Sequence, residues 1–131
     1  VEFFDEIVRV KISQYSWADK IELSYTIEIF NLYNSAIGES GRVITPFEED
    51  FVDSNWHLYP IKIQDGRRRE VFEYLKQKNV GVQVNYFPAH LHPVFLDQGF
   101  KRGNFPRAEA FYDAEISLPM HYGLQNSEGN T

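Results

Sequence analysis

The chain contains no cysteine among its 131 residues, which excludes disulfide bonds, thiolate catalysis and cysteine-ligated zinc. No apolar run approaches the roughly 20 residues that a membrane-spanning helix needs. Acidic residues interrupt the first ten positions, unlike a secretory signal peptide. Positive charge is also scarce, with 13 Lys and Arg against 19 Asp and Glu, which argues against a phosphate-backbone partner. We therefore expect a soluble cytoplasmic protein that binds neither nucleic acid nor membrane.

Aromatic residues are abundant, with 11 Phe and 8 Tyr, and 43% of all residues are hydrophobic. A chain of this length usually forms one domain with room for one sizeable core. The composition predicts a core built on rings, many of which carry a hydroxyl group that needs a hydrogen-bond partner.

Residues 1–40 are predicted to form a helical N-terminal segment. Ser16 and Asp19 resemble a capping box at a helix start, apolar residues follow at helical spacing, and Gly38 is a natural stop. A competing pattern exists, because every second residue from Ile21 to Ile29 is apolar or aromatic, as in a strand. Length and both end signals favour the helix.

Residues 41–124 are predicted to form the α/β part of the chain, and residues 125–131 an irregular tail. A polar, acidic loop is expected to about residue 54. The expected elements are then a strand at 56–63, a helix at 67–78, a strand at 80–86, short helices after Pro93 and Pro106, and a strand at 116–119. Pro60 suggests a sheet edge or a bulge, since proline cannot donate to the ladder. The order predicts an α+β two-layer sandwich with helices on one face of a small sheet.

The predicted strand at 80–86 delivers candidate binding residues to one place. Pro88 ends the ladder, so His90 and His92 fall on a loop at a strand end, where functional groups are commonly mounted. Ligand contact, assisted by Tyr86 and Asn85, and a purely structural role are favoured equally. A metal site is favoured less, although the other two histidines could complete it, namely His57 and His121.

Two basic clusters are weaker candidates. Arg67, Arg68 and Arg69 stand at a helix start, where cations oppose the helix dipole, and a solvated basic turn is favoured over an anion site. The loop Lys101–Asn104 has a composition that suits phosphate but no flanking fingerprint. No nucleophile or phosphate-loop motif is present in the sequence.

From residue 54 onward the sequence resembles the DegT/DnrJ/StrS sugar aminotransferases. Six segments match in order: Ser54–Ile61 (SNWHLYPI), Arg69–Leu75, Gly81–Tyr86, Pro88–Pro93 (PAHLHP), Phe105–Glu109 and Ile116–Pro119 (ISLP). The upstream helix resembles the family more loosely. The branch most resembled comprises transaminases of UDP-linked 4-keto-6-deoxy sugars, in pseudaminic-acid-type or spore-coat polysaccharide biosynthesis.

The resemblance implies the small C-terminal domain of the aspartate-aminotransferase fold, taken from a dimeric enzyme that uses pyridoxal phosphate. The large domain with its Schiff-base lysine is not in this chain, so the resemblance implies no catalytic and no cofactor-binding residue here. Tyr86, His90 and His92 match the segment that faces the substrate cleft, which implies contact with a nucleotide sugar; His57 is interpreted as structural. The alternative is a non-catalytic remnant that binds a nucleotide sugar or a partner protein.

Overall fold

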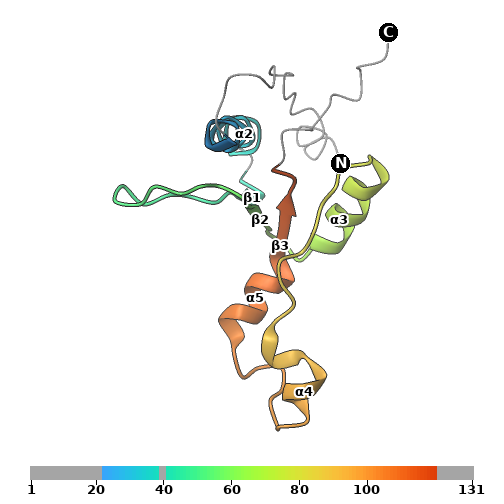
Figure 1. Ribbon diagram of the computed structural model, residues 1–131. Helices are drawn as coiled ribbons and strands as arrows, with labels where there is room; N and C mark the ends of the chain where they lie inside the picture. The colour runs from blue at the N-terminus through green and yellow to red at the C-terminus, as the bar shows by residue number, and fades with distance from the viewer. Residues whose placement is uncertain (1–21, 39–40, 121–131) are drawn as a thin grey trace.

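The computed structural model describes residues 22–38 and 41–120, and Figure 1 shows their arrangement. The helices and strands in chain order are α2 (Glu22–Ile37), β1 (Val43–Ile44), β2 (Tyr59–Ile63), α3 (Arg68–Gln77), the 3-10 turn η1 (Ala89–Leu91), α4 (Pro93–Leu96), α5 (Pro106–Ala114) and β3 (Glu115–Leu118). The predicted boundaries at residues 40 and 124 fall outside the described residues and stay predictions, as do the Ser16–Asp19 cap and the tail.

The sheet is antiparallel, with the strand order β1-β2-β3. In β2 every second residue is buried, beginning with Tyr59, and Ile61 is fully covered. The register places Ile61 opposite Ile116 and Ile63 opposite Val43. Because directly opposed residues lie on the same face of a sheet, these side chains form one continuous apolar face.

Two helices contribute to the core that covers this face. α2 supplies Ile29, Tyr33 and Ile37, which are four residues apart and therefore lie on one side of the helix, and α3 supplies Val71 and Leu75. The predicted α/β class, with helices packed on a small sheet, is confirmed. The helical interpretation of the segment after Ile21 is also confirmed, and the strand alternative was wrong.

Tyrosine hydroxyls fasten α2 to the sheet. The Tyr33 hydroxyl donates to the Pro119 carbonyl at 3.0 Å, and the Tyr59 hydroxyl donates to Asn34 Oδ1 at 2.6 Å. The two rings lie 4.8 Å apart. Burial raises the pKa of both phenols well above the ordinary value, so both stay neutral donors.

The predicted strand at 80–86 needs correction, because only one residue of it pairs. Gln83 and Ser117 exchange two backbone hydrogen bonds, of 3.1 and 2.8 Å, in an isolated antiparallel bridge. The next hydrogen-bonded pair of such a ladder would be Asn85 with Glu115. The Asn85 N–H instead donates to the Glu115 side chain, at Oε2 and 2.8 Å, so the ladder ends there.

Three smaller differences concern the segment before α3. The strand begins at Tyr59 rather than Trp56, which has a positive φ of 45° and stacks on Phe30 at 3.8 Å. Pro60 lies in the central strand β2 and not in an outer strand. However, β1 pairs only with Lys62 and Ile63, so at Pro60 the strand β2 is paired on one side only, with β3. The expected loop contains β1, and its remainder extends away from the sheet (Figure 1).

Candidate functional site

The candidate residues lie in an extension of the domain that we call the distal lobe, residues 86–111. It contains η1 and α4 and most of α5, and in Figure 1 it lies beyond the end of β3 that is farther from α2. α5 runs directly into β3. The lobe is therefore joined to the sheet by that helix and by the irregular segment that follows Gln83.

The structure separates the three predicted substrate residues by exposure. Tyr86 is 74% exposed. His92 is exposed, and its ring meets Phe87 edge-on at 5.0 Å. His90 is only 8% exposed. Tyr86 and His92 are thus available to a ligand, whereas His90 is buried.

His90 is engaged by a glutamate that the sequence reasoning did not single out. Its Nε2 lies 2.8 Å from Glu109 Oε1. The same carboxylate accepts the N–H of Gly103 at 2.8 and 2.9 Å and the N–H of Phe105 at 3.3 Å. Burial alone would raise the pKa of Glu109, but these donors outweigh it and hold the pKa below its usual value. The sequence did offer one indication of this role: Glu109 stands in the first turn of the helix after Pro106, where a carboxylate is favoured.

A second buried carboxylate, Glu115, lies where the lobe joins the sheet. It is fully covered, with Oε2 accepting the Asn85 N–H and Oε1 accepting the Ser117 hydroxyl at 2.5 Å. Burial raises the pKa of Glu115. Nearby, the guanidinium of Arg68 lies 5.3 Å from the centre of the Tyr112 ring, and its Nε is buried without a hydrogen-bond partner among the described residues.

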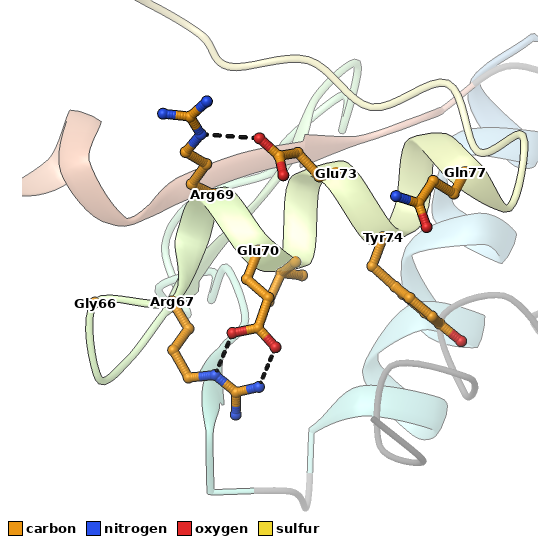
Figure 2. A pocket seen from close by; sticks show the side chains of 8 residues that line it. Gly66, Arg67, Arg69, Glu70, Glu73, Tyr74 and Gln77 are labelled. Carbon is orange, nitrogen blue, oxygen red and sulfur yellow. Dashed lines mark hydrogen bonds and ion pairs between the residues drawn. The ribbon is translucent and has the colours of Figure 1, made fainter.

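The other two arginines at the start of α3 form ion pairs within the helix. Arg67 bonds Glu70 through both Nε and Nη2, and Arg69 Nε donates to Glu73 at 2.8 Å. Figure 2 shows both pairs beside a surface hollow of about 550 Å³, which Tyr74 also lines. Both arginines that line the hollow are thus already paired with carboxylates.

The basic loop after α4, residues 101–104, likewise makes its contacts within the domain. Arg102 forms a two-pronged ion pair with Asp113, at 3.0 and 2.8 Å, and lies 3.8 Å from Glu109. The Lys101 N–H donates to Asn104 Oδ1 at 2.7 Å. These contacts shape the loop and pair its arginine with carboxylates.

The described residues were compared with what a metal ion and pyridoxal phosphate each require of a protein. It has no group of three or more His, Cys, Asp or Glu side chains that could hold a metal ion. Its lysines are exposed at Lys76, Lys78 and Lys101 and half-buried at Lys62, whereas a lysine bonded to this cofactor needs an enclosed pocket. No helix among residues 22–38 and 41–120 is long and apolar enough to cross a membrane.

Comparisons with known proteins relate the chain to one enzyme family. Residues 19–130 match the DegT/DnrJ/EryC1/StrS aminotransferase family. The spore coat polysaccharide biosynthesis protein SpsC of Bacillus subtilis is 32% identical over 107 residues, which are 77% of this chain and 28% of that protein.

Two solved structures share the fold. PseC of Helicobacter pylori, an aminotransferase of pseudoaminic acid biosynthesis, superimposes with a TM-score of 0.68 at 28% identity over 79% of this chain and 28% of its own. Spr1654 of Streptococcus pneumoniae, a candidate sugar aminotransferase solved in its PLP form, superimposes with a TM-score of 0.74 at 28% identity. The match covers 81% of this chain and 28% of the Spr1654 chain. The chain spans about a quarter of the length of these relatives. These matches confirm the resemblance: the chain belongs to the DegT/DnrJ/EryC1/StrS aminotransferase family.

Proposed function

We propose that this chain is the small C-terminal domain of a pyridoxal-phosphate-dependent aminotransferase. The parent enzyme aminates a nucleotide-linked keto sugar in cell-surface or spore-coat polysaccharide biosynthesis. Family membership supports the reaction type, and the relatives named for spore-coat polysaccharide and pseudoaminic acid support the substrate class. The residues that carry out the amino transfer are assigned to the part of the parent enzyme outside this chain.

The exposed apolar surface is the observation that carries this proposal. Scattered exposed hydrophobic residues are normal on a domain, but a gathered patch marks a surface that something else covers. Of the 14 large hydrophobic residues exposed in the described ranges, eight lie in the distal lobe: Tyr86, Phe87, Val94, Phe95, Leu96, Phe100, Phe105 and Phe111.

Ring contacts show that part of this set forms a patch. The Phe100 ring lies 6.1 Å from both the Phe95 and the Phe105 rings. A freestanding remnant would be expected to carry polar residues on such a surface. The patch therefore favours a domain whose lobe packs against the rest of a larger protein.

Within this proposal, Tyr86, His90 and His92 serve the nucleotide sugar. A phenol and an imidazole can both donate hydrogen bonds to diphosphate or sugar oxygens, and Tyr86 and His92 are exposed enough to do so. His90, bonded to Glu109, supports the turn between them. We assign these three residues to the substrate side of the cleft.

Pyridoxal phosphate supplies the electron sink that transamination requires. The exposed and half-buried lysines of the described residues do not fit the lysine that binds it, so we assign that lysine to the large domain of the parent. The parent is proposed to be a cytoplasmic homodimer.

The test compares two proteins with the same substrate. Full-length parent protein and the 131-residue chain are each incubated with pyridoxal phosphate, an amino donor such as glutamate and a UDP-4-keto-6-deoxy sugar, and products are identified by mass. We expect an amino sugar from the full-length protein and no product from the chain alone. An active isolated chain, an inactive full-length protein or a dehydrated sugar would each contradict the proposal.

A further inference from the structure

The segment from Asn85 to His92 has few backbone hydrogen bonds to the rest of the domain. It follows the single bridge at Gln83, and the ladder does not continue. Its N–H groups that donate to backbone carbonyls, Leu91 to Pro88 and His92 to Ala89, bond within the segment. At its far end, the His92 carbonyl accepts the N–H groups of Phe95 and Leu96 in α4. The conformation that presents Tyr86 and His92 therefore depends on side chains from other elements.

Two buried carboxylates hold this segment near its two ends. Glu115 accepts the Asn85 N–H, immediately before Tyr86. Glu109 contacts the His90 ring, two residues before His92. Both glutamates are less than 10% exposed, so water competes little with these contacts, and hydrogen bonds to carboxylates are stronger than those between neutral groups.

An aromatic contact holds the middle of the segment. The Phe87 ring meets the Tyr112 ring edge-on at 5.4 Å, and it also contacts the His92 ring. Glu109, Tyr112 and Glu115 are three residues apart along α5 and its continuation into β3. The first two lie on one side of α5 because of this spacing, and Glu115 follows directly as the first residue of β3. One continuous piece of chain therefore contacts the segment at three points.

We propose that Glu109, Tyr112 and Glu115 are positioning residues that hold segment 85–92 so that Tyr86 and His92 meet the nucleotide sugar. This inference rests on the proposed function, because it concerns the same substrate. It adds residues that act through the segment and do not touch the sugar themselves.

The experiment uses the full-length parent protein and two variants of Glu115, one that removes the acceptor and one that keeps it. In Glu115→Ala the Asn85 N–H loses its acceptor, and we expect the KM for the UDP-keto sugar to rise about tenfold, equivalent to one lost hydrogen bond. The kcat should stay within about twofold and the cofactor absorbance unchanged. Glu115→Gln should recover KM to within about threefold, because its amide oxygen still accepts this N–H. Glu73→Gln, which alters an exposed glutamate paired with Arg69 on α3, is the matched control.

A double-mutant cycle separates positioning from general damage. If Glu115 acts through Tyr86, Glu115→Ala should have little further effect on KM in a Tyr86→Ala background, because coupled residues are not additive. The same fold-change in both backgrounds, or an unchanged KM in Glu115→Ala, would overturn the inference. Should Glu115→Ala fail to fold, Tyr112→Leu, which removes the ring contact with Phe87, is put through the same cycle with the same criterion. A wild-type parent that does not aminate the sugar refutes the proposed function itself, whereas an active parent with additive variants refutes only the positioning role.

Discussion

Shortening Ile61 to valine tests whether the core lies on the face of the sheet that we describe. Ile61 is fully buried in the central strand, opposite Ile116. Removing one methylene from such a site costs about 0.5–1.5 kcal/mol, because a small cavity adds to the lost transfer free energy. The matched control is Ile44→Val, since Ile44 has the same side chain on the neighbouring strand but is 43% exposed. That change should cost less than about 0.5 kcal/mol.

The assay is urea unfolding of the chain, followed by far-ultraviolet circular dichroism. For a small domain with a slope of about 1–3 kcal/mol per molar urea, the expected loss lowers the midpoint by about 0.2–1.5 M. The slope should be the same in both variants. Equal midpoints for Ile61→Val and Ile44→Val would refute the assignment of the core face, as would a larger loss at Ile44.

Three further predictions concern the buried carboxylates and histidines. Glu109 has a lowered pKa in the folded state, so its ionised form stabilises the domain above about pH 4.5, and this advantage is lost as the pH falls through the lowered value. Glu109→Gln should therefore lower the urea midpoint at pH 7 and lose that deficit on acidification. Glu115 has a raised pKa in the folded state, so its contribution to stability is largest in acid and falls as the pH rises through the raised value. The urea midpoint of Glu115→Gln should therefore match or exceed that of the wild type at pH 7, and the two midpoints should converge toward pH 4. In the full-length parent, His92→Ala should raise the KM for the sugar at unchanged thermal midpoint and cofactor absorbance, whereas His90→Ala should also lower the thermal midpoint. A pH-independent deficit in Glu109→Gln, a destabilised Glu115→Gln at pH 7 or a loss of cofactor absorbance in His92→Ala would contradict the respective assignment.

Much of the fold was predictable because its elements carry clear local signals. The helices after Pro93 and Pro106 begin as predicted, since proline fits the first helical turn. The helix predicted at 67–78 ends beside Asn79, whose positive φ of 60° is a conformation that asparagine tolerates at helix ends. β1 was not predictable, because Val43 and Ile44 are too few residues to establish a period.

The site was less predictable because its geometry depends on distant partners. His90 and His92 are alike in sequence, and what separates them is the contact of His90 with Glu109, nineteen residues away. The alternation from Glu115 to Leu118 suggests a strand with one polar, solvated face, yet all four residues are buried. The Asn85 N–H donates to the side chain of Glu115 and not to its backbone, which explains why the strand predicted at 80–86 pairs only at Gln83.

If this chain is one part of a larger aminotransferase, the intact mass of the native gene product must exceed the mass of the chain. The product can be captured with an antibody raised against the chain and measured by mass spectrometry. The chain spans about a quarter of its relatives' length, so we predict a protein several-fold heavier than 15.4 kDa. A product of 15.4 kDa would contradict the claim and identify a freestanding domain.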